Sequence, residues 1–221
     1  MQWLMLLAWG MATVYCGRKK TSAFIMRLMI TIGLILSMAT QLYLLWLDGL
    51  LSVDTGLPLH FCSAFALLSI PLLWFGWQWL LDLSLLLGAP FALMALLFPA
   101  VITSSHQSLM LTAFLRLHVL ILCAPLLLVK EGKPLPSTPH IAFVFGNGFL
   151  LFVSAMNRML DTNYLFLKMA PMGTPLELLF SKGNLFYICS LEILCMLLLS
   201  FLCGVYRAVP RVHAALTLRN T

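Results

Sequence analysis

Long apolar runs separated by short polar segments dominate this sequence. Of its 221 residues, 62% are hydrophobic and only 9% are charged, whereas a soluble domain is about half apolar and about a quarter charged. A soluble fold of this length cannot cover so much apolar surface with a single core. The pattern therefore predicts a polytopic membrane protein, and it excludes a cytosolic enzyme, a disordered tail and a nucleic-acid-binding domain.

Seven of the runs have the apolar character of membrane-spanning helices. They cover approximately residues 1–16, 23–47, 57–75, 79–100, 109–129, 140–155 and 186–206. We expect an all-α bundle of about seven transmembrane helices that forms a single integral membrane domain over residues 1–221. The first run is the shortest, since its sixteen residues rise only about 24 Å as a helix.

The basic residues indicate the orientation of the chain. If the N-terminus lies outside and the C-terminus inside, nine of the thirteen Lys and Arg residues lie on the inner side. These nine are Arg18, Lys19, Lys20, Arg27, Lys130, Lys133, Arg207, Arg211 and Arg219. Inner segments of membrane proteins carry such an excess. We therefore expect this orientation, and we read the net charge of +6 as an inner-surface signal rather than a sign of a nucleic-acid partner.

The six cysteines predict neither disulfides nor a metal centre. Five of them lie well inside apolar runs, Cys62 lies just inside the start of one, and no pair has CxxC spacing. Buried cysteines of this kind usually behave as small hydrophobic residues. We expect no metal and no cofactor.

Two segments depart from the apolar pattern. The fourth run carries Asp82, and Gly88-Ala89-Pro90 is expected to interrupt it. The segment of about thirty residues at 156–185 is polar and would join the last two spans on the outer face. A long loop in so compact a chain is more often functional than idle.

Polar side chains within the runs mark the candidate site, because each is costly in lipid unless it is partnered or faces a cavity. Pro58 is expected in the first turn of the third span, followed by His60 and Cys62. Side chains two positions apart on a helix point to opposite sides. His118 of the fifth span is therefore the better partner for Cys62. A thiol with an imidazole base is the arrangement of covalent acyl transfer.

Other polar residues are expected in the outer half of the same bundle. The set with expected supporting or substrate-binding roles is His60, Gln41, Asn157, Asn163, Tyr164 and Glu192. Asn157, Asn163 or the backbone near the third span could also stabilise an oxyanion. Arg116 is expected to extend its side chain to the outer interface.

Two motifs, in this order, resemble the YwaF-like family of bacterial integral membrane proteins. Leu57-Pro-Leu-His-Phe-Cys62 resembles the PLHxC signature of that family, and Asn163-Tyr-Leu-Phe-Leu167 resembles its NYLYL element. His118 is similar to the histidine of the family's fifth span. The resemblance covers approximately residues 18–201 and implies a bacterial plasma membrane as the location.

The resemblance also implies an activity. The family includes a vertebrate TMEM-type acyltransferase that installs arachidonoyl chains on ether lysophospholipids with a cysteine nucleophile and a histidine partner. These roles correspond to Cys62 and His118 in this sequence. The fold is also similar to that of the androgen-induced-type membrane hydrolases. We expect a membrane enzyme that transfers or hydrolyses fatty acyl groups, with a membrane phospholipid or lysophospholipid as its partner.

Two other functions stay open at the level of the sequence. A transporter of small molecules or ions would make use of Asp82, Glu192 and the interruption at Gly88-Ala89-Pro90. A lipid-binding or assembly protein without catalytic activity would need only the apolar helices. The sequence names no protein partner.

Overall fold

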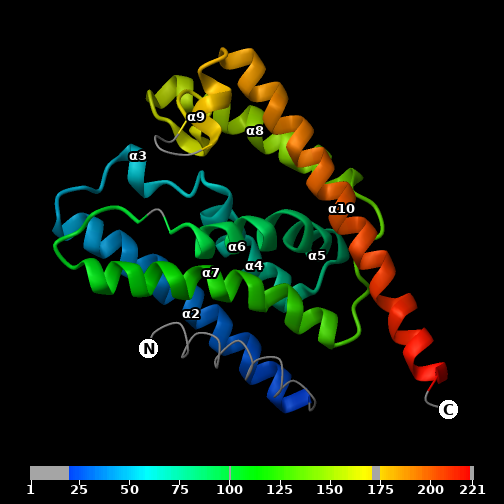
Figure 1. Ribbon diagram of the computed structural model, residues 1–221. Coiled ribbons are helices and arrows are strands. Elements are labelled where there is room, and N and C mark those ends of the chain that lie inside the picture. The colour runs from blue at the N-terminus through cyan, green and yellow to red at the C-terminus, as the bar shows by residue number, and fades with distance from the viewer. Residues whose placement is uncertain (1–19, 100, 171–174, 220–221) are drawn as a thin grey trace. The chain divides into compact units, whose positions relative to one another are not determined.

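The computed structural model describes residues 20–99, 101–170 and 175–219, and every regular element in these ranges is helical (Figure 1). The chain forms two compact units, which meet in sequence between Pro134 and Leu135. The predicted first span, residues 1–16, and the basic residues 18–19 lie outside the described ranges. The single membrane domain stays a prediction.

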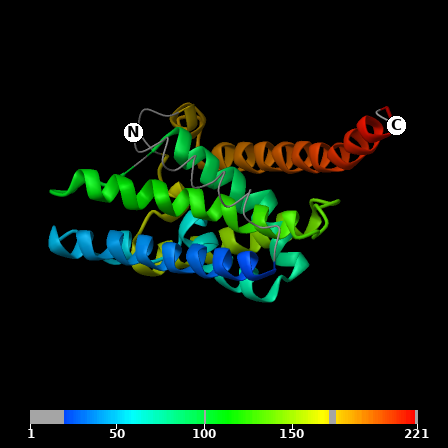
Figure 2. The ribbon, with the colours of Figure 1, turned by 90° about the horizontal axis from the view of Figure 1, so that it is seen from below.

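The first unit has α7 at its centre. Its elements are α2 (Lys20–Leu47), α3 (Val53–Gly56), α4 (Phe61–Phe75), α5 (Gln78–Leu83), η1 (Ser84–Gly88), α6 (Ala89–Leu97) and α7 (Gln107–Lys130). α2 and α7 lie side by side and antiparallel, and α4 and α6 also pack against α7 (Figure 1 and Figure 2). Gly33 permits a close approach, since a Cβ atom there would lie 2.6 Å from a methyl carbon of Leu120.

Polar contacts close both ends of the α2–α7 pair. At one end, Arg27 forms an ion pair with Glu131. At the other end, the hydroxyl groups of Ser104 and Ser105 donate hydrogen bonds to the carboxylate of Asp48. These bonds hold the pKa of the Asp48 carboxyl below its usual range. Because each end is fixed by a specific pair, the register of the two helices is well determined.

α4 begins at Phe61, four residues later than the span predicted at 57–75. Leu57 is extended, with φ −83° and ψ 143°, as expected for a residue before proline. Pro58 therefore precedes the helix instead of occupying its first turn. His60 is the extended N-cap, with φ −80° and ψ 147°. The prediction that His60 and Cys62 share a helix is wrong.

The predicted interruption at Gly88-Ala89-Pro90 is also wrong. Helical structure continues from Gln78 to Leu97 through α5, the π-helical turn η1 and α6. Pro90 is the second residue of α6 and follows directly after the π-helical turn. The helix ends at Leu97 rather than at residue 100, because Phe98 leaves the helical conformation with φ −128° and ψ 72°.

The second unit contains α8 (His140–Leu160), the 3₁₀ turn η2 (Tyr164–Phe166), α9 (Pro175–Phe180) and α10 (Asn184–Arg219). α8 continues five residues beyond its predicted end at residue 155, and α10 begins two residues before its predicted start at residue 186. The predicted loop at 156–185 is accordingly shorter and contains both η2 and α9. The Asn147 side chain of α8 donates a hydrogen bond to Glu192 of α10.

Five helices of the described chain are long and apolar enough to cross a membrane. They are Ala23–Leu47, Gln78–Leu97, Gln107–Lys130, His140–Leu160 and Asn184–Ala208. α4 is also apolar but has only 15 residues. Large apolar side chains such as Leu151 and Leu185 are more than 70% exposed, as expected when lipid is the solvent. The all-helical membrane architecture is confirmed, whereas seven spans and their orientation stay predictions.

Candidate functional site

His118 lies in the middle of α7 and is 3% exposed. Its Nδ1 atom lies 2.7 Å from the carbonyl oxygen of Phe114, one turn earlier. Because a carbonyl oxygen can only accept, Nδ1 carries the proton of this hydrogen bond. In the neutral ring, Nε2 is then the nitrogen with the lone pair. This is the tautomer that a general base requires.

Cys62 lies in the first turn of α4 and is half-buried, with a free thiol. It precedes Ala66, Ser69 and Leu73 by four, seven and eleven positions. These three residues are buried, and positions with such spacing share one face of a helix. The Cys62 side chain therefore lies on the packed side of α4.

The packing of α4 against α7 brings the two candidate catalytic positions to similar depths. The ends of the two helices lie together, since a Cβ atom at Gly76 would be 3.5 Å from Cε of Lys133. Counted back from those ends, Cys62 and His118 are separated from them by about 20 Å and about 18 Å of helical rise. A cysteine and a histidine on neighbouring parallel helices need such a match in depth to interact.

The π-helical turn η1 packs against both α4 and α7. Gly88 at its end makes room for Phe65, because a Cβ atom there would lie only 2.8 Å from Cδ1 of the Phe65 ring. One turn further, Phe61 and Phe91 stack with 4.6 Å between ring centroids. The rings of Phe61, Phe65 and Phe91 therefore pack together at the start of α4, the helix that carries Cys62. Turns of this π type often occur at functional sites.

Two other residues of the predicted site lie in the first unit. His60 is half-buried in the segment before α4. Gln41 lies on α2, and its Nε2 donates to the carbonyl of Ser37 at 3.3 Å. The structure thus places Gln41 beside its own helix backbone and His60 at the entrance to the helix that carries Cys62.

Arg116 does not extend to the outer interface as expected. Its Nε donates a 2.7 Å hydrogen bond to the hydroxyl of Ser37 on α2. Ser37 is not among the site residues predicted from the sequence. The available signal was its position in the outer half of a span, one helical turn before Gln41.

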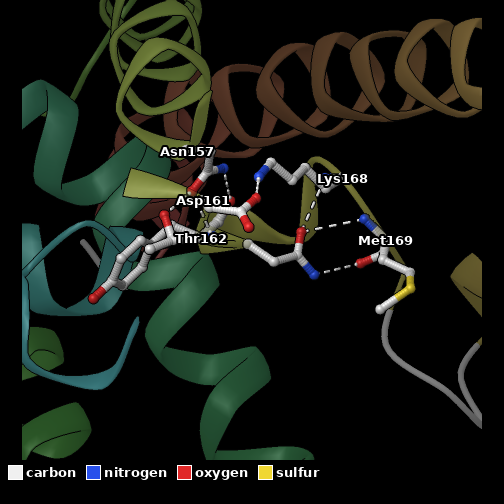
Figure 3. Close-up of polar contacts among 7 residues, drawn as sticks. Asn157, Asp161, Thr162, Lys168 and Met169 are labelled. Atoms are coloured by element: carbon white, nitrogen blue, oxygen red, sulfur yellow. Dashed lines mark hydrogen bonds and ion pairs between the residues drawn. The ribbon is translucent and has the colours of Figure 1, made fainter. Parts of the chain in front are cut away.

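Asn157 holds together the segment that follows α8 (Figure 3). Its side chain is buried, at 1% exposed. Its Oδ1 accepts hydrogen bonds from the Tyr164 N–H and the Thr162 hydroxyl, both at 2.8 Å. Its Nδ2 donates to the Tyr164 carbonyl at 2.9 Å. Both ends of the amide are therefore used within this segment, and Tyr164 is buried against it at 2% exposed.

Asn163 has a similar structural role. Its Oδ1 accepts from the backbone N–H groups of Lys168 and Met169 at 2.9 Å and 3.2 Å, and its Nδ2 donates to the Met169 carbonyl at 3.0 Å. Lys168 also forms a 2.7 Å ion pair with Asp161 (Figure 3). Hydrogen bonding to Lys168 and its positive charge lower the pKa of the Asp161 carboxyl. The side chains of this segment therefore determine its conformation. The oxyanion role of the two asparagines stays a prediction.

The predicted site residues fall into two groups. Gln41, His60, Cys62 and His118 belong to the first unit, and Asn157, Asn163, Tyr164 and Glu192 belong to the second. Within the first unit, the packing of α4 against α7 brings the helices of Cys62 and His118 together. The convergence of seven of these residues, all except Tyr164, in the outer half of one bundle stays a prediction. Among the described residues, no group of His, Cys, Asp and Glu side chains has an arrangement that could hold a metal ion.

A bundle of long apolar helices with lipid-compatible surfaces defines an integral membrane protein. Residues 1–203 match the family model described as the TMEM164 family, and since this is most of the chain, the chain belongs to the TMEM164 family. No curated protein and no solved structure gives a significant match. The predicted resemblance to TMEM-type membrane proteins is confirmed at this level, while the YwaF-like bacterial type stays a prediction.

Proposed function

We propose that this protein is a membrane enzyme that transfers or hydrolyses fatty acyl groups on membrane lipids, with Cys62 as nucleophile and His118 as base. The observation that carries the proposal is the hydrogen bond from His118 Nδ1 to the Phe114 carbonyl. It leaves Nε2 basic on the helix that packs against the helix of Cys62. Membership of the TMEM164 family and the resemblance to a TMEM-type cysteine acyltransferase support the same activity.

The reaction has two covalent steps. Nε2 of His118 takes the thiol proton, and Cys62 Sγ attacks the acyl carbonyl carbon of a phospholipid. The bond to the lipid oxygen then breaks, the leaving oxygen takes the proton back from His118, and an acyl thioester stays on Cys62. In the second step, His118 removes a proton from a lysolipid hydroxyl or from water, which attacks the thioester. The new ester or acid leaves, and the thiol is restored.

The beginning of α4 supplies donors for the oxyanion of both steps. The first N–H groups of a helix have no partner within the helix, and the side chain of the N-cap His60 caps none of them. The N–H groups of Cys62 and Ser63 belong to this first turn. Donors of this kind, fixed before the reaction begins, usually contribute a large part of the stabilisation of a tetrahedral intermediate.

The proposal includes a membrane topology and a location. The chain would cross the membrane seven times, with α4 and residues 1–16 as the two spans beyond the five long helices. The N-terminus would lie outside, in the plasma membrane of a bacterium of the YwaF-like type. With that orientation, the Arg27–Glu131 pair is on the inner side and the Asp48 contacts are on the outer side.

The test is lipid turnover by the purified protein in nanodiscs. Phospholipids with a labelled acyl chain are supplied with lysophospholipid acceptors, and transferred and released acyl chains are measured by mass spectrometry. We expect Cys62→Ala to abolish turnover and His118→Gln to lower it about 10²–10⁴-fold, the usual contribution of a general base. Cys123→Ala, which removes a buried thiol on α7, is the matched control. Full turnover by Cys62→Ala would refute the proposal.

A further inference from the structure

Arg116 is a permanent cation held near the middle of a membrane helix. It is the tenth of the 24 residues of α7, about 14 Å of rise from the start of that helix. Its Nε donates to Ser37 Oγ at 2.7 Å, and this hydroxyl in turn donates to the Gly33 carbonyl at 2.6 Å. The second contact orients the hydroxyl so that its lone pairs face the guanidinium. The side chain is thereby fixed against α2 at this depth.

The first unit offers this cation no carboxylate. Its acidic residues are Asp48, Asp54, Asp82 and Glu131. Asp48 accepts from Ser104 and Ser105, Asp82 accepts from Gln78, Glu131 pairs with Arg27, and Asp54 lies in the short helix α3 outside the spans. The ion pairs Arg27–Glu131 and Lys168–Asp161 do not involve Arg116. The residues outside the described ranges contain neither Asp nor Glu.

An unpaired guanidinium at this depth calls for an anion from elsewhere. Arginine stays protonated in proteins and carries five N–H donors, of which the hydrogen bond to Ser37 uses one. A charge in a low-dielectric region is costly unless it is paired. The planar fork of the guanidinium fits the two oxygens of a phosphate or a carboxylate. In a membrane, the anions of this type belong to lipid headgroups and to fatty acids.

Polar side chains continue from Arg116 toward the end of α7 that lies nearer to Asp48. Thr112 is one turn away on α7, and Gln41 is one turn from Ser37 on α2. Their own hydrogen bonds, to the Ser108 and Ser37 carbonyls, run along the helices. Ser37, Gln41, Thr112 and Arg116 form a polar stripe across the α2–α7 contact.

We propose that Arg116 and Ser37 form a binding site for the anionic oxygen group, phosphate or carboxylate, of a membrane amphiphile. The site is separate from Cys62 and His118, because side chains two positions apart on α7 point to opposite sides. It goes beyond acyl transfer, since it requires only binding. Its ligand is defined by a single-chain or double-chain apolar tail and a head with at least two anionic or partly anionic oxygens.

Native mass spectrometry of the full chain in detergent tests this proposal. Three amphiphiles with the same oleoyl chain are offered at equal concentration: lysophosphatidic acid, oleate and monooleoylglycerol, which is neutral. We expect the wild type to retain at least one anionic amphiphile tenfold or more over the neutral one. Retention of lysophosphatidic acid alone identifies a phosphate site, and retention of oleate alone identifies a carboxylate site. Equal retention of all three overturns the proposal.

The variants separate this site from general lipid adhesion. Arg116→Gln is expected to reduce anionic retention to the level of the neutral amphiphile. Arg116→Lys keeps the charge and loses the fork, so we expect a partial loss, and Ser37→Ala, which frees the guanidinium, should also give a partial loss. Arg158→Gln removes an exposed arginine of α8 and should change nothing. Undiminished anionic retention by a folded Arg116→Gln variant would overturn the proposal. The same loss in Arg116→Gln and in Arg158→Gln would overturn it as well.

Discussion

The hydrogen bond between His118 Nδ1 and the Phe114 carbonyl decides which nitrogen of that ring is basic. The hydrogen bonds of Asn157 and Arg116 likewise determine which of their polar atoms are available to bind another group. Asn157 has both ends of its amide in use. Arg116 has most of its donors left over. At the scale of the residue, the distinction between structural and functional polar groups follows from which atoms are already bound.

Asp48 makes the stability of the protein depend on pH. Its carboxyl has a lowered pKa because Ser104 and Ser105 donate hydrogen bonds to it. A group of this kind stabilises the fold above its unfolded pKa of about 3.9, and the contribution is lost as the pH falls through the lowered value. We expect the melting temperature to fall less between pH 6 and pH 3 in Asp48→Asn than in the wild type. Scanning fluorimetry measures the melting temperature at each pH, and Asp54→Asn is the control variant.

A drop of the same size in Asp48→Asn and in the wild type would show that this carboxyl does not contribute. Because Asp48 is a surface group, salt should also reduce the charge-dependent part of the effect.

Asn157 is expected to be important for stability. Asn157→Ala leaves the N–H and carbonyl groups of Tyr164 without the partners that they have now, and each unsatisfied buried group costs about 1–3 kcal/mol. We expect a lower melting temperature and faster proteolytic cleavage between residues 161 and 170. Asn163→Ala, at a more exposed position, should have a smaller effect. Equal stability of Asn157→Ala and the wild type would contradict this interpretation.

At the scale of the element, α5, η1 and α6 act as one helix with a π-helical turn in its middle. The turn presents Gly88 to Phe65 and so allows the helix to approach α4 closely. This approach packs Phe65 against the π-helical turn near the start of the helix that carries Cys62. The shape of the region thus depends on a single position without a side chain.

Gly88→Ala is expected to destabilise the protein. A Cβ atom at Gly88 would lie 2.8 Å from Cδ1 of Phe65, and overpacking of this kind costs about 1–3 kcal/mol. Thermal melting compares the Gly88→Ala variant with Gly148→Ala as the control. A Cβ atom at Gly148 would meet nothing within 4 Å, and helix propensity favours alanine there. The double variant with Phe65→Leu should recover part of the loss. A Gly88→Ala protein as stable as the Gly148→Ala protein would contradict the account.

The long helices could be predicted from the sequence because uninterrupted apolar runs define them. α2, α7 and most of α8 follow the runs closely. The start of α4 was predicted too early, since proline is compatible with a first helical turn as well as with the extended segment that it occupies here. The π-helical turn was missed, because Gly88 and Pro90 look like a break when the hydrogen bonds are unknown. The extension of α8 was missed because its last turn is polar.

At the scale of the whole molecule, the residues that carry the proposed chemistry all lie in the first unit. Cys62 and His118 are candidates from the sequence because an imidazole at membrane depth is costly unless partnered, and because Cys62 lies in the segment that resembles the PLHxC signature. Their catalytic roles stay a proposal. The roles of Asn157 and Asn163 could not be chosen, since an amide that closes a turn and an amide that binds an oxyanion are the same residue in a sequence. Only the hydrogen bonds of the amide distinguish a structural role from an oxyanion-binding role.

The orientation of the whole chain has a direct test. Thr103, near the Asp48 end of the first unit, and Thr138, before α8, are both exposed. In the proposed topology they lie on opposite sides of the membrane. A membrane-impermeant maleimide added to intact cells should label Thr103→Cys and should reach Thr138→Cys only after the membrane is permeabilised. Labelling of both without permeabilisation, or of Thr138→Cys alone, contradicts the orientation.

The central claim is that the thiol of Cys62 carries the acyl group. Intact-mass spectrometry tests it most directly, on protein quenched within seconds of mixing with an activated fatty ester. The account predicts a mass gain of one acyl chain that hydroxylamine removes, that is absent in Cys62→Ala and that persists in Cys123→Ala. The same gain in Cys62→Ala, or lipid turnover that this variant leaves unchanged, would contradict the account.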